Sequence, residues 1–528
     1  MRPFRALTGV LVVGALVAVL VGTAPPGVAG ATAGPVGGRS PAETAVDWRP
    51  CPEDPSAECG TLRLPVDWAR PSGERFALAL ARRTATDPGR RVGVLLVNPG
   101  GPGDPGARFA IERAPSYFSA RVRERFDIVG FDPRGVGGSR PVRCSTGLLA
   151  QRPSPYPRDQ AEFERLAAFN RALREDCRRH SGPLYDHADT LSVVRDMEAV
   201  RVALGEERIS YFGHSYGTLI GQQYAERYGE RIRAMALTAN MDHSLGIREF
   251  LVSSAATAED SFHQFVNWCE RTTSCALHGR DVTDVWDRLL ARADQGAVRD
   301  PGRPGRVLTA NAITHIALTR FYGPRWDVLA DYVADLDAQR PTGPDGPRRP
   351  PPRIPPRAAD PTAVGAVAVD PVAPEPTTAE PTTADPFHAV FCQDWRFRPK
   401  DHREFARLTA AETRAAPHMR GAPRAHAAIA GCVGWPDEVN NPQQRPRITK
   451  APTILLLHGR HDPASPYIWA VTVHRQTRGT TALLPYDGAG HAVYGRTDCT
   501  RDAVDGYLME LKVPQAGSRC APATAQGH

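Results

Sequence analysis

A serine held between two glycines is the clearest chemical signal in this sequence. Ser215 lies in "ISYFGHSYGTLIGQQYAERYG", a short apolar run followed by a turn and a helix-like run, with Gly213 and Gly217 on either side of the serine. The spacing G-x-S-x-G predicts a tight elbow between a strand and a helix, with the serine hydroxyl exposed at its tip. Glycine permits the strained turn and the close approach of helix to strand. Ser215 is therefore a candidate nucleophile, with a plain strand-to-helix turn as the alternative.

A base and an acid must accompany such a serine, because a hydroxyl is a poor nucleophile until a base takes its proton. His491 lies in a glycine-rich turn beyond the strand expected at 481–486 and is the candidate base. Asp462 follows the strand expected at 453–457 and would orient the imidazole and stabilise its charged form. The order serine, acid, histidine along the chain is that of hydrolases with a nucleophile elbow.

Other histidines and acids near these two residues are alternatives. His458 and His461 precede or adjoin the acid instead of following it on a later strand, so we expect neither of them to be the base. Asp487 is the rival acid, but it comes only four residues before His491. Chain order and strand position favour Asp462.

The negative oxygen that forms during acyl transfer needs N–H donors. Tyr216, directly after the serine, would offer its backbone N–H. The stretch "VNPGGPG" (97–103) would supply a second donor, because Gly100 and Gly101 can approach a substrate closely. A phosphate-binding loop is the alternative for this stretch, but the G-K-[ST] ending is missing.

Short apolar runs followed by turn residues predict the sheet that must position these groups. Because the runs are apolar throughout, they suit parallel strands that are buried on both faces. Helical patterns lie between them, as at 190–205, so the alternation predicts an α/β sheet flanked by helices. The runs lie at 91–103, 126–139, 208–217, 232–240, 452–462 and 481–491.

The sheet pattern is interrupted once, which divides the chain. Residues 51–244 and 451–528 carry the strand-like runs and are expected to form the two parts of one core. Residues 245–450 are richer in helical pattern, so we expect an inserted, mainly helical cap domain there. Within it, 341–386 is so dense in proline that it cannot build a packed core, and we expect it to be extended or disordered.

The N-terminus has the pattern of a secretory signal peptide. Residues 1–31 comprise a basic start, an apolar middle and an A-x-A-like exit, and 32–50 would be an N-terminal tail. A membrane anchor is the alternative, but the apolar run is near the lower length limit for spanning. No second long apolar stretch occurs, so we expect a secreted, extracellular protein without stable membrane insertion after signal removal; attachment to the cell wall is left open.

The net charge indicates whether the protein binds nucleic acid, and the cysteines indicate whether it folds in an oxidising compartment. The net charge of +7 is mild and the basic residues are scattered, so we expect no nucleic-acid partner. The ten cysteines occur in neighbouring pairs, and five local disulfides are the simplest interpretation in an oxidising compartment. A zinc site is the alternative, but no C-x-x-C occurs, so we expect no metal and no cofactor. The pairs are Cys51 and Cys59, Cys144 and Cys177, Cys269 and Cys275, Cys392 and Cys432, and Cys499 and Cys520.

Several motifs occur in one order that resembles a known family. They are "NPGGPG", "GFDPRGVGGS", "YFGHSYGT", "LLLHGRHDPASP" and "GAGHAVY", and "AVFCQDW" (389–395) is similar to a cap-region motif. Together they resemble the secreted tripeptidyl aminopeptidases of actinomycetes, serine peptidases related to prolyl aminopeptidase. The resemblance covers about 50–240 and 387–520. It implies an α/β-hydrolase fold with a cap and the C-terminal region typical of these enzymes.

The resemblance also implies roles for individual residues. It implies a catalytic triad of Ser215, Asp462 and His491, with Gly101 and Tyr216 donating to the oxyanion.

Three further residues take roles from the same resemblance. Asp132 and Arg134 match a D-x-R-G-x-G-x-S motif and would be structural supports near the site, or simply a buried ion pair that fixes a loop. Peptidases that act at a free N-terminus need an acid to receive the α-ammonium group. Asp394 is the candidate by its place in the cap motif, and an ordinary exposed acid is the alternative.

The function expected from this combination is a secreted serine exopeptidase. It would hydrolyse peptides from a free N-terminus, releasing tripeptides, through an acyl-enzyme. A secreted carboxylesterase or lipase-like enzyme on the same triad is one alternative, because function lies in the pocket and not in the fold. A non-catalytic exported binding protein that retains the fold is the other.

Overall fold

The computed structural model describes residues 45–339, 380–436 and 438–523. The expected signal peptide and most of the expected tail lie outside these residues, as does most of the proline-rich segment 341–386. Among the described residues, no helix is both long and apolar enough to cross a bilayer.

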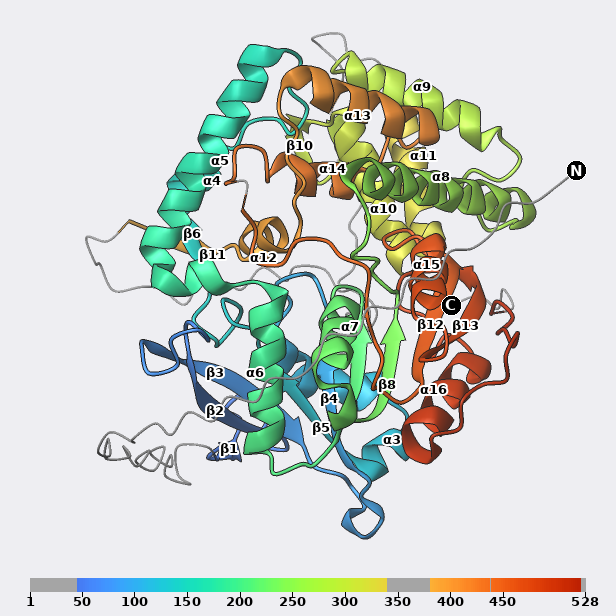
Figure 1. The fold of residues 1–528 in the computed structure, drawn as a ribbon. Coiled ribbons are helices and arrows are strands. Elements are labelled where there is room, and N and C mark those ends of the chain that lie inside the picture. Colours follow the sequence, from blue (N-terminus) through green and yellow to red (C-terminus); the bar gives the residue numbers. More distant parts are fainter. Residues whose placement is uncertain (1–44, 340–379, 437, 524–528) are drawn as a thin grey trace, which may run out of the picture. The chain divides into compact units, whose positions relative to one another are not determined.

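A nine-stranded sheet forms the centre of the fold (Figure 1). Its order is β1-β2-β3-β5-β4-β7-β8-β12-β13. The strands from β5 to β13 in this order pair in parallel, and β1, β2 and β3 add an antiparallel edge. The strands are β1 Arg49–Pro50, β2 Glu58–Pro65, β3 Arg75–Arg83, β4 Gly93–Asn98, β5 Phe126–Phe131, β7 Ile209–His214, β8 Ile232–Thr238, β12 Ile454–His461 and β13 Thr481–Ala489. The α/β class expected from the apolar runs is confirmed.

Helices cover both faces of this sheet. Neighbouring residues of a strand point to opposite faces, so Leu96 and Tyr211 pack with α6, α7 and α15, whereas Leu95 and Phe212 pack with α2, α3 and α16. Every residue of β4 and β7 is buried, which explains their uninterrupted apolar character. These helices are α2 Ala114–Tyr117, α3 Ala120–Arg125, α6 Thr190–Ala203, α7 Gly217–Tyr228, α15 Tyr467–Gln476 and α16 Asp498–Glu510.

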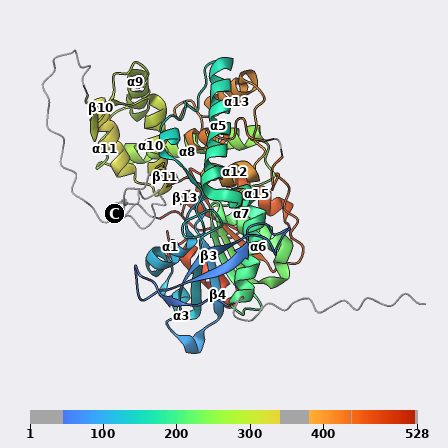
Figure 2. The same ribbon diagram turned by 90° about the vertical axis from the view of Figure 1, so that its left-hand side faces the viewer.

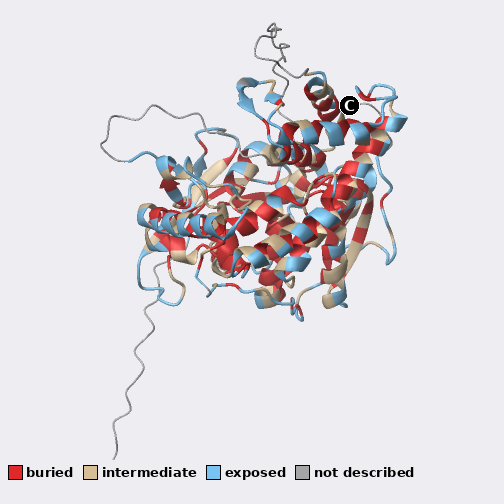
Figure 3. Cartoon of the chain, turned by 90° about the horizontal axis from the view of Figure 1, so that it is seen from above, coloured by how far each residue is buried: buried red, intermediate tan, exposed pale blue. Residues whose placement is uncertain are grey.

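A helical layer, here called the cap, lies beyond the carboxyl ends of the parallel strands (Figures 1 and 2). Viewed from above, exposed and buried residues alternate along the helices (Figure 3). Most of the cap comes from the expected insertion at 245–450. Its helices are α8 Ile247–Arg271, α9 Val282–Asp294, α10 Ala310–Tyr322, α11 Trp326–Asp337, α12 Phe387–Asp394, α13 His402–Ala415 and α14 Pro423–Ala430.

The cap also includes residues from the first half of the chain, which the sequence pattern assigned to the core. Helix α5 (Gln160–Ser181) packs its buried side chains with those of α12, α13 and α14. Asn170 of α5 donates hydrogen bonds to the carbonyls of Ala430 and Val433, at 2.9 and 2.8 Å. The periodicity of 160–181 predicts a helix but does not indicate the layer to which it belongs.

A short strand joins these two parts of the cap. β11 (Thr382–Ala384) pairs antiparallel with β6 (Arg143–Ser145). Of the two alternatives expected for 341–386, the extended one describes residues 382–384, because their backbone groups find partners in β6. The remaining short α-helices and strands are α1 Gly106–Arg108, α4 Thr146–Leu149, β9 Arg299–Asp300 and β10 Arg303–Val307.

Five disulfides join the neighbouring cysteines that the sequence paired. They are Cys51–Cys59, Cys144–Cys177, Cys269–Cys275, Cys392–Cys432 and Cys499–Cys520. Together they account for all ten cysteines of the sequence. This usage fits an oxidising compartment.

Candidate active site

Ser215 lies at the turn between β7 and α7 in a strained backbone conformation. Its φ is +54°, which non-glycine residues rarely adopt. The two flanking glycines are required by packing: a Cβ on Gly213 would lie 2.6 Å from the carbonyl oxygen of Gly217, and one on Gly217 would lie 2.6 Å from that of Asn98. The turn is therefore the elbow that the spacing predicts, and it presents Ser215 at the carboxyl end of a central strand.

His491 and Asp462 meet at the same edge of the sheet. His491 Nδ1 lies 2.9 and 3.0 Å from the two carboxylate oxygens of Asp462. Their side chains are 6% and 1% exposed. Burial acts to raise the pKa of Asp462, but the charge and hydrogen bond of His491 outweigh it, so the pKa of this carboxyl lies below its usual value. Asp462 therefore stays ionised and His491 Nδ1 donates, which leaves Nε2 to act as a base.

Two rings and one carbonyl hold His491 in place. The His214 ring lies 4.6 Å and the Tyr322 ring 4.9 Å from the His491 ring, both in edge-to-face contact. The backbone N–H of His491 donates to the Tyr322 carbonyl at 2.8 Å. Because His214 directly precedes Ser215, the elbow and the imidazole belong to one site. The Ser215 hydroxyl makes no hydrogen bond within the described part of the chain, which is common in sites without substrate.

The rival residues have other partners. His458 Nδ1 accepts from the Asn240 N–H and its Nε2 donates to the Ser465 carbonyl, at 3.0 and 2.8 Å. His461 Nδ1 lies 2.7 Å from an Asp260 oxygen. The rival acid, Asp487, pairs with Arg460 and Arg519, at 2.5 and 3.3 Å. None of these partners is His491.

Two backbone N–H groups are available beside the serine. Gly101 and Tyr216 both line the pocket described below, and neither N–H donates to another residue of the described ranges. Gly100 lies against the elbow, because a Cβ there would come within 2.8 Å of the Tyr216 nitrogen. Its own N–H donates to the Asn98 side chain at 3.0 Å. Gly101 and Tyr216 can therefore donate to an oxyanion formed next to Ser215.

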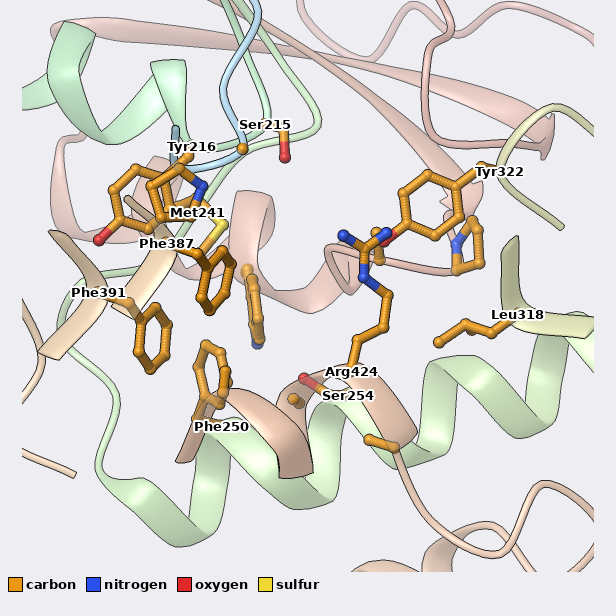
Figure 4. A pocket seen from close by; sticks show the side chains of 18 residues that line it. Ser215, Tyr216, Met241, Phe250, Ser254, Leu318, Tyr322, Phe387, Phe391 and Arg424 are labelled. Atoms are coloured by element: carbon orange, nitrogen blue, oxygen red, sulfur yellow. The ribbon is translucent and has the colours of Figure 1, made fainter. Parts of the chain in front are cut away.

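A pocket opens in front of Ser215. Figure 4 shows the Ser215 hydroxyl pointing into it, with Phe250, Phe387 and Phe391 on one side and Tyr322, Leu318 and Arg424 on the other. Arg424 is the only charged residue among those described that line it, and its guanidinium carbon lies 5.1 Å from the Tyr322 ring centroid. Most of the remaining lining is apolar. Helices α8, α10, α12 and α14 supply much of this wall, so the cap covers the serine.

Comparison with known proteins agrees with this geometry. A family model described as alpha/beta hydrolase fold matches residues 93–495. "Serine protease Hip1" of Mycobacterium tuberculosis is 31% identical over 511 residues, which cover 90% of this chain and 91% of that protein. The chain belongs to the alpha/beta hydrolase family.

Two other relatives of this hydrolase are similar over nearly the whole chain. "Tripeptidyl aminopeptidase" of Streptomyces lividans is 27% identical over 506 residues, covering 91% of this chain and 87% of that protein. "Carboxylesterase B" of Mycobacterium tuberculosis is 32% identical over 524 residues, covering 94% and 95%. The predicted resemblance to the tripeptidyl-aminopeptidase-like serine peptidases of actinomycetes is confirmed, and the chain is a serine hydrolase.

The hydrolase buries Asp394, which the sequence suggested as an acceptor for substrate. Asp394 is fully buried, does not line the pocket, and accepts hydrogen bonds from four donors. Its donors are the Thr190 N–H and hydroxyl, the Tyr216 hydroxyl and the Asn441 amide, at 2.8, 2.5, 2.7 and 2.9 Å. Burial, assisted by the nearby charge of Asp189, raises its pKa to about 7. The structure therefore places Asp394 behind Tyr216, where it anchors the residue that follows the nucleophile.

Asp132 and Arg134 do not pair with each other. Arg134 forms a buried two-point ion pair with Asp196 of α6, with N–O distances of 2.6 and 2.7 Å. Asp132 accepts from the N–H groups of Ala107 and Gly138, at 2.9 and 2.8 Å. The interpretation of the two as one ion pair is wrong, because the chain turns between them and their side chains reach different elements.

Three residues near the site, Asp104, Tyr322 and Arg424, were not predicted from the sequence. Tyr322 and Arg424 come from the cap, where no motif marks them. Asp104 directly follows the loop 97–103, and its position after that loop was the available signal. Burial raises the pKa of Asp104, against the opposing charges of Arg424 and His491. Its carboxylate accepts no hydrogen bond and forms no ion pair among the described residues.

Proposed function

We propose that this hydrolase is a secreted exopeptidase that removes short peptides, most simply tripeptides, from a free N-terminus. The printed name of the Streptomyces lividans relative supports this activity. The covered site supports it as well, because cap helices over Ser215 admit the end of a peptide more readily than the middle of a folded chain. The five disulfides and the signal-like N-terminus support secretion.

The reaction proceeds through an acyl-enzyme. Ser215 Oγ attacks the scissile carbonyl carbon while His491 Nε2 takes its proton, and the N–H groups of Gly101 and Tyr216 stabilise the negative oxygen. His491 then gives the proton to the leaving amine as the C–N bond breaks. Water attacks the ester that remains while His491 takes its proton, and His491 then gives that proton to Ser215 Oγ as the ester C–O bond breaks. Asp462 holds the imidazole and stabilises its charged form throughout.

The observation that carries the catalytic proposal is the buried Asp462–His491 pair beside a strained serine that faces a pocket. A fluorophosphonate probe tests it directly. We expect the wild-type protein to be labelled and Ser215→Ala to remain unlabelled. If the folded wild-type protein is not labelled, the catalytic proposal is wrong and a binding protein that retains the fold is favoured.

Asp104 is the candidate acid for the substrate's α-ammonium group in place of the buried Asp394, although its side chain, like that of Asp394, is not among the described residues that line the pocket. It lies beside the proposed oxyanion loop, because a Cβ on Gly101 would come within 3.3 Å of the Asp104 carboxyl carbon. Its carboxylate is unpaired among the described residues. We expect Asp104→Asn to raise KM for tripeptidyl anilides with a free amino group. N-acetylated substrates should be cleaved poorly by wild type and variant alike.

A carboxylesterase is the second candidate, and two observations favour it. The pocket is lined mainly by apolar side chains with a single arginine, and the Mycobacterium tuberculosis relative is named "Carboxylesterase B". Turnover of tripeptidyl anilides against short p-nitrophenyl esters separates the two. The peptidase proposal fails if the esters are cleaved and unblocked peptides are not. Identification of the released fragments by mass spectrometry then tests whether tripeptides leave.

A further inference from the structure

Two histidines and a glutamate converge in the cap, away from the catalytic pocket. Glu259 and His263 lie on α8, and His418 lies between α13 and α14. Each residue offers one possible ligand atom, an imidazole nitrogen or a carboxylate oxygen, and these three atoms lie within 4.8 Å of one another. We propose that these three residues bind a divalent transition-metal ion, with Zn²⁺ as the best chemical fit.

Local geometry brings the three groups together. Residues four apart on a helix share one face, so Glu259 and His263 point the same way. Glu259 Oε1 lies 3.7 Å from His263 Nε2 and 2.5 Å from His418 Nδ1. Ligand atoms about 2.0–2.2 Å from a tetrahedral zinc ion lie roughly 3.3 Å from one another. An ion can therefore enter if these side chains shift by less than about 1 Å.

The segment that carries His418 is already fixed on α8. The backbone N–H groups of His418 and Met419 donate to a Glu259 oxygen, at 3.2 and 3.1 Å. The His418 ring stacks on Phe262 with 5.1 Å between centroids, and its carbonyl accepts from Trp286 Nε1 at 2.9 Å. Hydrogen bonds of this kind orient metal ligands in known sites and raise affinity.

The donor set suits zinc better than calcium or magnesium. Two imidazoles and one carboxylate are the ligands of many zinc sites, whereas calcium and magnesium prefer oxygen alone. The side chain of His263 is 52% exposed, so an ion can enter from solvent, while that of Glu259 is 9% exposed. Protons compete with the ion for the two imidazole nitrogens, so binding weakens at acidic pH.

Such an ion would link two walls of the catalytic pocket. Thr257 of α8 donates to the Asp462 carbonyl at 2.7 Å. The segment that carries His418 leads into α14, from which Arg424 and Ala428 line the pocket. The ion would tie α8 to this segment and so stabilise the cap without taking part in hydrolysis. The cysteine spacing gave no sign of this site, because its ligands lie 155 residues apart in the chain (263 to 418).

Titration of the full, chelator-treated protein with ZnCl₂ tests the proposal. We expect one zinc ion per chain at pH 7.5 and weaker binding at pH 5.5. His263→Ala should lower the affinity by about tenfold or more, because one ligand is lost. This variant should fold, since the side chain is exposed and its contacts within the described residues are to Glu259 and its ring neighbours. His278→Ala is the matched control, because His278 is an exposed histidine of the cap outside the cluster.

Thermal unfolding gives a second readout that does not depend on activity. Saturating zinc should raise the midpoint of the wild type and of His278→Ala by at least about 2 °C, and should leave His263→Ala unchanged. Equal zinc affinity in the wild type and His263→Ala would overturn the proposal. So would the absence of one-to-one binding, or an equal loss of affinity in His278→Ala.

Discussion

Replacing Asp394 by asparagine should change how the stability of the protein depends on pH. The Asp394 carboxylate is fully buried behind Tyr216, and burial raises its pKa to about 7 from the ordinary 3.8. Asparagine has the same shape and is neutral at every pH, so it imitates the protonated acid. Its oxygen can still accept from the Thr190 N–H and the Asn441 amide, and its NH₂ group would face the two hydroxyls.

The magnitude follows from the difference in pKa between the folded and unfolded states. About three pKa units at 1.36 kcal/mol each amount to about 4 kcal/mol. The folded-state pKa is the higher one, so the contribution of Asp394 to stability is complete below about pH 4 and is lost as pH rises through about 7. The unfolding free energy of Asp394→Asn relative to wild type should therefore increase by about 4 kcal/mol from pH 4 to pH 8.

Urea unfolding at these two pH values, with the disulfides intact, measures the effect. The matched control is Asp335→Asn, since Asp335 is an exposed aspartate of α11. In this control the difference from wild type should be the same at both pH values. An equal difference at both pH values for Asp394→Asn would refute the reasoning. It would mean that the four hydrogen-bond donors keep the buried carboxylate ionised and outweigh its loss of hydration.

Three other substitutions test the site and its supports. Asp462→Asn should lower kcat by about 10⁴ with little change in KM, measured with the preferred anilide or ester, because the imidazole loses the group that orients it. Gly217→Ala should destabilise the protein by about 1–3 kcal/mol in urea, since its Cβ would lie 2.6 Å from the Asn98 carbonyl oxygen. Arg134→Ala should cost about 3–5 kcal/mol because it leaves Asp196 buried without its partner; a loss below about 1 kcal/mol would contradict this account.

The elements around the nucleophile were predictable because their signals are local. The glycines beside Ser215 indicate a tight turn, because a larger side chain at either position would collide with the backbone. The uninterrupted apolar runs indicate strands that are buried on both faces. Asp462 and His491 follow such strands, and parallel strands end at one edge of a sheet. The segments around Ser215, Asp462 and His491 are far apart in the chain, and their patterns therefore predict that the three residues meet at one edge of the sheet.

Other features depend on contacts that no local pattern carries. Asp394 looks like an accessible acid in its motif, but its donors come from residues 190, 216 and 441. Arg134 stands two positions from Asp132 and still finds its partner on α6. Helix α5 has the same periodicity whether it packs on the sheet or on the cap. The partners of Asp394 and Arg134 and the layer to which α5 belongs are set by the tertiary packing of the whole chain.

The pairing of β6 with β11 has a practical consequence for engineering this enzyme. A chimera that exchanged only 245–450 would separate Thr382–Ala384 from its partner strand and strip α5 of the helices against which it packs. A transplant must therefore carry 143–187 as well, so the exchangeable unit of this architecture is two separate pieces of chain.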